Sequence, residues 1–447
     1  MGIAAQLLPV LPTEHSRALT LALLLFINSL ILESNEVVAT SGFVSRVGPE
    51  QILWVWAVAL LAGMISSGAY SLVVDRTRRE RLATAVFLGF AVLYVALYGL
   101  FRLGAPDSVS YPLLTMVNEQ QWLLLPMLMW ALAGDLFSVA ESKRLFPLLG
   151  MAAFAGGIAG NLVTASLAQR LSQSPAGSVV LLLMNAAWLL LMAAILTLSS
   201  RRIKIATRQA AKNDKPLEIL REGLAFVREV PSYRYLTLAM LLLGASLNVI
   251  EYQLIATMAQ VHAGGASLEA FYATLRAARI VLMLLVQGLA AGWLLKRFGF
   301  KSVFFLMPLA LLGGLLLAWL WPTLIGVVLG EYLSRITLQG IDEPSRRSFV
   351  GLVPDERRGR VSAFIDGYPY QLGSILSCGM VLAVLAAVRR NVLTPQMGRT
   401  VYTALALACA ATALWALTRF RAHYDASMFN WRLRRRQRKS LLDNIEF

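Results

Sequence analysis

The residues best placed to do chemistry are charged side chains inside long apolar stretches. Glu33 and Glu36 stand three residues apart in the first stretch, so on a helix they share one face, with Asn35 beside them. A charge at bilayer depth is costly, and it is usually paired or lines a watery cavity. We therefore expect an acidic site for a proton, a cation or the cationic group of a solute. The alternative is that one or both carboxylates meet water near the outer end of the stretch.

A second group of candidates lies in the seventh and eighth apolar stretches. Glu251 stands at a similar depth in the seventh stretch, one turn after Asn248. Arg276 and Arg279 share one face of the eighth. Because arginine is a good bidentate partner for carboxylate or phosphate, two alternatives remain. The arginines bind an anionic solute, or they neutralise Glu251.

Two later features concern the tenth and eleventh stretches. Glu331 and Arg335 stand four residues apart with the acid first, which is the favourable order for an intrahelical pair, so we expect a structural role. Tyr368 and Gln371 flank Pro369 near the start of the eleventh stretch. A helix breaker among aromatic and polar residues predicts a discontinuous helix that lines a cavity.

The composition tells which elements must position these residues. The 447 residues are 57% hydrophobic and only 15% charged, whereas soluble domains carry roughly 25% charged residues. A helix needs about 20 mostly apolar residues to cross a bilayer. We predict an all-α membrane protein with twelve transmembrane helices in two six-helix bundles. The predicted spans are 18–43, 50–74, 82–104, 112–138, 145–169, 178–199, 234–260, 268–295, 302–320, 322–340, 361–387 and 400–420.

The connections between the spans predict the topology. Those at 75–81, 200–233, 296–301 and 343–360 are rich in Arg and Lys, whereas those at 44–49, 261–267 and 321 are nearly free of them. Basic loops face the cytoplasm, so both termini are predicted to be cytoplasmic in a bacterial inner membrane. The net charge of +16 then reflects topology and not nucleic-acid binding. Asp75 and Arg79, in the first basic connection, are candidate gating charges on the cytoplasmic side.

The two halves of the chain contain similar residue patterns. Asn35 and Glu36 in the first span resemble Asn248 and Glu251 in the seventh. We expect an N-terminal bundle over 1–199, a cytoplasmic linker with an amphipathic helix over 200–233, a C-terminal bundle over 234–420 and a basic cytoplasmic tail over 421–447. Paired halves with a central loop are typical of major-facilitator transporters, whose substrate site lies near the midplane. Anionic lipid is the expected partner of the tail.

Motifs for catalysis or cofactor binding are missing from the sequence. It contains no Ser/His/Asp or Cys/His arrangement, no glycine loop that would cradle phosphate and no metal-ligand spacing. We therefore predict no enzymatic activity, no cofactor and no metal, and the expected partner is a small-molecule substrate, with or without protons.

Three short runs resemble the ATP/ADP antiporter (nucleotide transporter) family. They are WALAGDLFSVAESKRLFPLLG at 130–150, LLKRFGFKSV at 294–303 and PDERRGRVSAFID at 354–366, and they occur in the family's order. The resemblance implies the major-facilitator architecture and exchange of nucleotides across a membrane. It also implies roles for the residues that match the family's charged elements, which are Glu141, Lys143, Arg144, Arg360 (where the family has a functional Lys) and Asp366.

The first span departs from this family. The family carries an Arg-Asp-Thr-Lys run there, and this chain has Glu33-Ser-Asn-Glu36 at the corresponding positions. A reversed sign repels a polyphosphate. The leading hypothesis is a secondary active transporter of an organic anion, nucleotide-like or otherwise, working by alternating access with proton coupling through Glu36 or Glu251. The alternatives are a proton-coupled carrier of a neutral, cationic or lipid-like solute, and a non-transporting receptor or scaffold.

Overall fold

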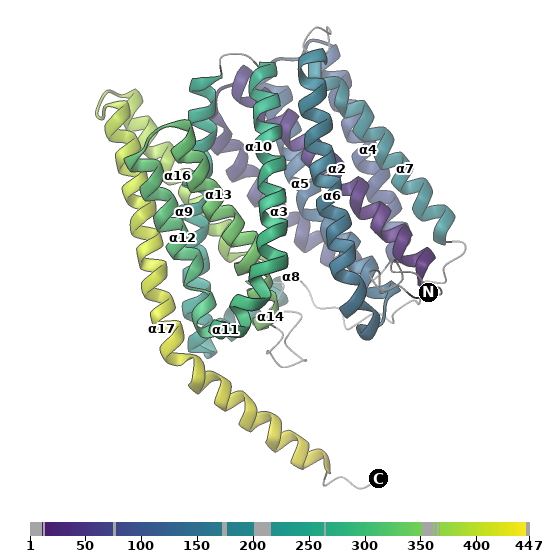
Figure 1. The fold of residues 1–447 in the computed structure, drawn as a ribbon, viewed down its shortest axis with the longest axis vertical. Helices are drawn as coiled ribbons and strands as arrows, with labels where there is room; N and C mark the ends of the chain where they lie inside the picture. Colours follow the sequence, from purple (N-terminus) through teal and green to yellow (C-terminus); the bar gives the residue numbers. More distant parts are fainter. Residues whose placement is uncertain are drawn as a thin grey trace. The chain divides into compact units, whose positions relative to one another are not determined.

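The chain folds into long helices (Figure 1). The computed structural model describes residues 11, 14–74, 77–171, 177–200, 216–262, 265–350, 361, 364–365 and 367–443, and no β-strand occurs among them. Helices suit an apolar chain in lipid, because a helix satisfies its backbone hydrogen bonds within one segment.

Two compact units can be distinguished. Unit 1 comprises residues 1–213 together with Met258–Leu284, and unit 2 comprises Asp214–Thr257 together with residues 285–447. The helices of unit 1 are α2 (His15–Arg46), η1 (Pro49–Gln51), α3 (Ile52–Val74), α4 (Arg79–Arg102), α5 (Asp107–Leu136), α6 (Val139–Leu171), η2 (Gly177–Val180), α7 (Leu181–Ser200) and most of α10 (Gly265–Val286).

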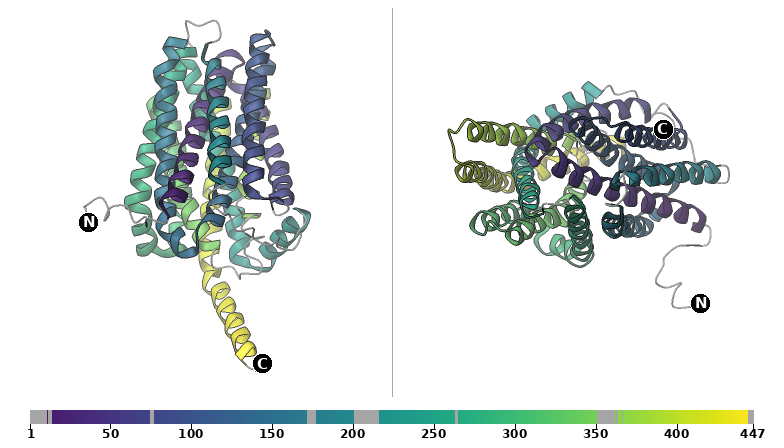
Figure 2. Two further views of the ribbon diagram at one scale, coloured as in Figure 1. Left: turned by 90° about the vertical axis from the view of Figure 1, so that its right-hand side faces the viewer. Right: turned by 90° about the horizontal axis from the view of Figure 1, so that it is seen from above.

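Unit 2 holds the remaining helices, two of which are π-helical turns. They are α8 (Pro216–Glu229), most of α9 (Pro231–Val261), η3 (Gln287–Ala291), α11 (Gly292–Val303), α12 (Leu306–Leu320), α13 (Leu324–Thr337), η4 (Leu338–Asp342), α14 (Glu343–Val350), α16 (Pro369–Arg389) and α17 (Pro395–Asp443). The last helix continues well past the end of the predicted span at 420 (Figure 2). The predicted amphipathic helix of the linker corresponds to α8.

Where its residues are described, each of the twelve predicted spans falls on a helix or on consecutive helices. Within the described ranges, ten segments combine the length and the apolar composition needed to cross a membrane. α5 and α10 have 30 and 22 residues, which is also long enough. Polar and charged residues, such as those of α10 at Glu269, Arg276 and Arg279, lower their hydropathy. The all-α membrane architecture is therefore confirmed.

The grouping of α10 differs from the order of the chain. The predicted boundaries put this helix in the C-terminal bundle of 234–420, because it follows the central linker. In the structure, Met258–Leu284 packs with the helices of unit 1. Polar side chains of α10 contact α2 and η2, as described below.

The crossing of α2 and α6 sets the position of the acidic residues. A Cβ atom added to Gly156 or Gly160 of α6 would collide with the backbone of Phe26 or Leu30 in α2. The missing side chains let the two backbones approach closely, as small residues do in membrane helix pairs. Gly157 lies between them, and a Cβ there would stand 3.4 Å from Cγ of Glu33. This stripe of glycines therefore places Glu33 directly against α6.

In unit 2, α16 begins anew at Pro369. Tyr368 precedes it with φ −120° and ψ −50°, outside the regular helical conformation. Residues 361, 364, 365 and 367 just before it are helical where they are described. The interruption agrees with the discontinuous helix that the sequence predicts at this point.

Candidate functional site

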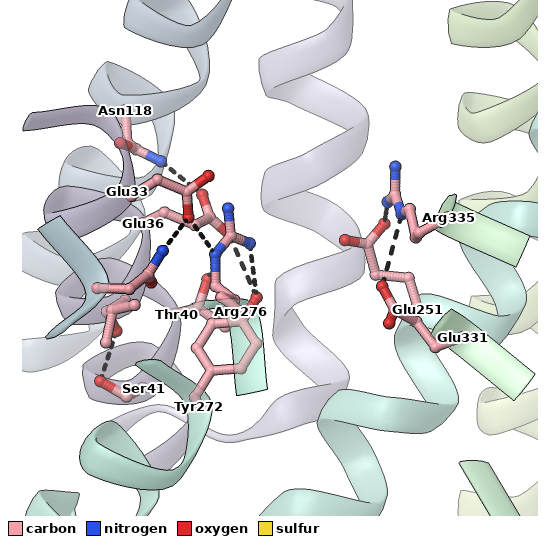
Figure 3. A network of polar contacts seen from close by, with 12 residues as sticks. Glu33, Glu36, Thr40, Ser41, Asn118, Glu251, Tyr272, Arg276, Glu331 and Arg335 are labelled. Carbon is pink, nitrogen blue, oxygen red and sulfur yellow. Dashed lines mark hydrogen bonds and ion pairs between the residues drawn. The ribbon is translucent and has the colours of Figure 1, made fainter. Parts of the chain in front are cut away.

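Glu33 forms the centre of a buried polar cluster in unit 1 (Figure 3). The residue is 6% exposed. Its Oε2 accepts hydrogen bonds from Nε of Arg276 at 2.7 Å and from Nδ2 of Asn161 at 2.9 Å. Asn161 also donates to the carbonyl of Gly157 at 2.9 Å, which orients its amide towards Glu33. Both bonds stabilise the charged form of the carboxylate.

Glu36 lies one turn later on the same face of α2 and is the less buried of the two acids. Its Oε2 accepts from Nδ2 of Asn118 at 2.6 Å, and its Oε1 accepts from Oγ1 of Thr40 at 3.1 Å. Nη1 of Arg276 is 3.6 Å from Oε1, which is an ion pair without a close hydrogen bond. Glu36 is thus the looser of the two acidic partners of Arg276.

Arg276 reaches these acids from α10. The residue is 5% exposed. Its Nη1 donates to the hydroxyl of Tyr272 at 3.3 Å, and its guanidinium carbon is 5.5 Å from the centroid of the same ring. The Tyr272 hydroxyl in turn donates to Oε1 of Glu36 at 3.5 Å. Tyr272 therefore supports both the cation and the looser acid.

Asn35 faces a different set of helices. Its Nδ2 donates to Oε1 of Gln121 at 3.3 Å, and its Oδ1 accepts from Nδ2 of Asn185 at 2.6 Å. Tyr94 donates to the same Gln121 oxygen. This fully buried layer ties α2 to α4, α5 and α7, so Asn35 fixes the helix that carries Glu33 and Glu36.

A second acid–arginine cluster lies in unit 2. Arg335 of α13 forms an ion pair with Glu251 of α9, and its Nε is 3.8 Å from Oε1 of Glu331 (Figure 3). Glu331 is 1% exposed. The expected intrahelical pair is therefore present. Arg335 also pairs with Glu251, for which the sequence suggested Arg276 and Arg279 as partners.

The two clusters share one charge pattern. In each, one guanidinium faces two carboxylates among the contacts just described. Arg279, one turn beyond Arg276, is also buried. A buried ion pair broken on one side leaves a costly uncompensated charge.

Other predicted site residues of unit 2 make contacts of their own. Nδ2 of Asn248 donates to Sγ of Cys378 at 3.4 Å. Tyr368 stacks on Phe364 with ring centroids 5.7 Å apart. Oε1 of Gln371 is buried without a hydrogen-bond partner among the described residues.

The predicted cytoplasmic-side charges are distributed over several local contacts. Nη1 of Arg79 bonds Oδ1 of Asp135 at 2.9 Å, and Nη2 of Arg144 bonds Oε1 of Glu14 at 2.7 Å. The positions of Asp75, Arg360 and Asp366 lie outside the described residues, as does the side chain of Lys143.

Glu141 forms a capping box at the start of α6. The Ser138 amide donates to Oε2 of Glu141 at 2.7 Å, and the Glu141 amide donates to Oγ of Ser138 at 3.4 Å. Arg17 bonds Oε1 at 3.3 Å. The backbone amide and the hydroxyl of Ser138 lower the pKa of the Glu141 carboxyl below 4.5, with a smaller contribution from Arg17. The geometry gives Glu141 a local structural role.

Several residues of the polar clusters were not singled out by the sequence analysis. Asn118, Asn161 and Tyr272 complete the cluster around Arg276. In unit 2, Nε of Arg346 bonds Oδ2 of Asp342 at 2.7 Å, and the Tyr370 hydroxyl donates to the same oxygen at 3.3 Å. The available signals were lone polar residues in apolar helices and the four-residue spacing of Tyr272 and Arg276. Among the described side chains, no group of three or more His, Cys, Asp or Glu could hold a metal ion.

Comparison with known proteins extends these observations. Residues 107–318 match the family model described as TLC ATP/ADP transporter. The resemblance seen in the sequence is therefore confirmed over this part of the chain. No curated protein matches the chain.

Solved structures share the fold at low sequence identity. A crystal structure of the nucleoside transporter NupG has a TM-score of 0.67 and 15% identity, covering 91% of this chain and 98% of that one. A bacterial homologue of the iron transporter ferroportin, in its inward-facing state, has a TM-score of 0.64 and 14% identity, covering 92% and 99%. A variant of the peptide transporter POT has a TM-score of 0.62 and 12% identity, covering 92% and 94%.

These comparisons define the class of the protein. The likeness to the solved structures shows the major-facilitator fold, and the family match adds the transporter assignment. Together they support a multi-pass membrane transporter for a small molecule and not an enzyme.

Proposed function

We propose that this transporter moves a small organic anion by alternating access, and that the anion binds Arg276 in place of Glu36. The observation that carries the proposal is the unequal spacing of the two acids around one buried guanidinium. Glu33 holds Nε at 2.7 Å, whereas the Glu36 oxygen stands 3.6 Å from Nη1. Glu36 is therefore the partner that leaves at the smaller cost.

The shared guanidinium couples this exchange to a proton. A solute anion beside Arg276 would meet Glu33 and Glu36, the two carboxylates that face the same guanidinium. Protonation of Glu36 removes one of these negative charges and frees Nη1 for a carboxylate or phosphate oxygen. Glu33, with its own hydrogen bond from Asn161, keeps the guanidinium in place. The proposed cycle is therefore symport of a proton with an anion.

The remaining carboxylate restricts the anion. Each further negative charge on the solute would face Glu33 at short range, where the local dielectric is low. This favours a solute with one carboxylate or phosphate group over a nucleoside triphosphate. The family description names ATP and ADP, and NupG is a nucleoside transporter, so nucleotides and nucleosides belong in the first set of candidates.

A neutral or cationic solute is the second candidate. In both clusters two carboxylates share one guanidinium among the described contacts, and an amine on the solute would pair with one of these acids. Such a carrier would not need Glu36 to be protonated before the solute binds. The dependence of uptake on pH therefore separates the two candidates.

The test is uptake into proteoliposomes. Labelled nucleoside monophosphate, monocarboxylate, nucleoside and ATP are offered with and without an inwardly directed proton gradient. We expect gradient-driven uptake of the monocarboxylate or the nucleoside monophosphate, and not of ATP. Glu36→Gln retains uptake but loses the gradient dependence, Arg276→Gln loses uptake, and Arg102→Lys, at the exposed end of α4, behaves as wild type. Undiminished anion uptake by Arg276→Gln, or wild-type uptake of only cations or neutral solutes, would overturn the proposal.

The proposal also includes the membrane and the orientation. Both termini are placed in the cytoplasm of a bacterial inner membrane, with the basic tail of 421–447 on anionic lipid. Cysteine variants at exposed Thr77 and Leu103 test the orientation in a background without Cys378 and Cys409. An impermeant maleimide added outside should label Leu103→Cys and leave Thr77→Cys unlabelled, and the reverse pattern would contradict it.

A further inference from the structure

A third buried carboxyl in unit 1 has surroundings unlike those of Glu33 and Glu36. Glu269 stands in the first turns of α10 and is 6% exposed. Its Oε2 accepts one hydrogen bond, from Oγ of Ser178 in η2 at 2.5 Å. Its Oε1 is buried, and no described residue gives it a hydrogen bond.

Glu269 differs from the acids of the Arg276 cluster in the groups that contact its carboxyl. Glu33 and Glu36 face a guanidinium and amide donors, which stabilise a carboxylate. Within the described part of the chain, no cation forms an ion pair with Glu269, and a single hydroxyl contacts it. An ionised carboxylate buried in this way would keep most of its desolvation cost, whereas the neutral acid would not.

The other ionisable groups at this end of unit 1 do not alter the preference of Glu269 for its neutral form. Tyr111 of α5 lies within electrostatic range of Glu269, Asp107 and Arg46. Arg46, at the end of α2, is exposed to solvent. His262, at the end of α9, stacks on Phe271 of α10 with ring centroids 4.6 Å apart. Arg276, two turns further along α10, is occupied by Glu33 and Glu36.

We propose that Glu269 is a second proton-binding site of the transport cycle, protonated in this arrangement and deprotonated when the start of α10 is exposed to water. The proton comes from bulk water and returns to it. This inference rests on the proposed function for its place in the cycle, but not for the protonation itself. Neither Glu36 nor Glu251, which the sequence favours for proton coupling, is required for it.

Because of where Glu269 lies, its protonation affects the contact between α10 and η2. The described polar links between α10 and the rest of unit 1 include that of Glu269 to η2 and those of Arg276 and Tyr272 to α2. Ionisation of Glu269 makes the first link unfavourable while buried, so alkaline pH favours release of this end of α10. Acid pH favours the arrangement seen here. Protonation would thus bias the position of the helix that carries Arg276.

The primary experiment is infrared difference spectroscopy of the full-length protein in lipid, titrated with pH in the absence of any solute. We expect a protonated-carboxyl C=O band that disappears on alkalinisation. Glu269→Gln removes this band, whereas Glu50→Gln, a half-buried acid of η1, leaves it unchanged. Ser178→Ala removes the donor that favours the charged form, so the band should persist about one pH unit higher.

These outcomes are separable from failure of the proposed function. The band requires no transport, so it would survive a demonstration that the protein carries no anion. An unchanged band in Glu269→Gln overturns the inference. Where Glu269→Gln does not fold, Ser178→Ala serves as the test on its own. A carboxyl band that does not shift in that variant also overturns the inference.

Discussion

Glu33 and Arg276, separated by 243 residues in the chain, are joined by a 2.7 Å hydrogen bond between Oε2 and Nε. Both residues are buried in unit 1. Glu33 comes from the first long helix and Arg276 from a helix that the chain reaches only after the central linker. Their pairing explains why a helix of the predicted second half is grouped with the first six.

The first prediction concerns the stability of this pair. Arg276→Gln removes the guanidinium that pairs with the buried Glu33 and the half-buried Glu36, and breaking a buried pair costs about 3–5 kcal/mol. The double variant Glu33→Gln/Arg276→Gln removes one of the uncompensated charges. We expect it to be more stable than Arg276→Gln alone. Thermal unfolding in detergent measures both, and strictly additive effects of the two substitutions would contradict the direct coupling.

The second prediction concerns the helix crossing beneath the acidic site. Gly160→Ala places a methyl group against the carbonyl oxygen of Leu30. The α2 and α6 backbones must separate, at a cost of about 1–3 kcal/mol, and Glu33 moves away from Asn161. Gly150→Ala in the same helix is the control, because open space surrounds that position. It should be neutral or slightly stabilising. Equal melting temperatures for the two variants would refute the close approach.

The positions of the helices, and the charged residues within them, could be predicted from the sequence because both follow from local composition. Apolar length predicts a span, and a charge within it stands out, as Glu33, Arg276 and Glu331 did. Spacing along one helix also predicted the pairing of Glu331 with Arg335.

The partners from other helices were not predictable in the same way. Assigning Arg276 to Glu33, and Arg335 to Glu251, requires knowing which helix faces which. The chain order suggested Arg276 as a partner of Glu251, since their spans are consecutive. Glu269 was missed because, near the end of a span, a carboxylate is ordinarily expected to be solvated, and only its burial against Ser178 sets it apart.

The third prediction compares the acids of unit 2. Glu251→Gln leaves Arg335 with Glu331, so one cation still faces one anion. Arg335→Gln removes the guanidinium that both carboxylates face, and one of them is almost fully buried. We expect Arg335→Gln to lose about 3 kcal/mol or more, and Glu251→Gln considerably less.

An exposed pair one helix later provides the control. Nη2 of Arg347 is 3.8 Å from Oε2 of Glu343 at the surface. Arg347→Gln should change stability by less than about 1 kcal/mol. If Glu251→Gln proves as damaging as Arg335→Gln in denaturation assays, the two acids do not share the arginine in the manner described.

The fourth prediction concerns pH and the capping box of α6. Ser138 lowers the pKa of Glu141 in the folded protein, so the ionised carboxylate is favoured by folding. Its contribution is fully present above the unfolded value, near 4.5, and is lost as pH falls through the lower folded value. Glu141→Gln should therefore lower the melting temperature slightly at neutral pH and flatten its decline in acid. Ser138→Ala should act in the same direction, since it removes the hydroxyl half of the box. Melting curves recorded across this acid range test both variants, and wild-type acid sensitivity retained in Glu141→Gln would assign the pH dependence to another group.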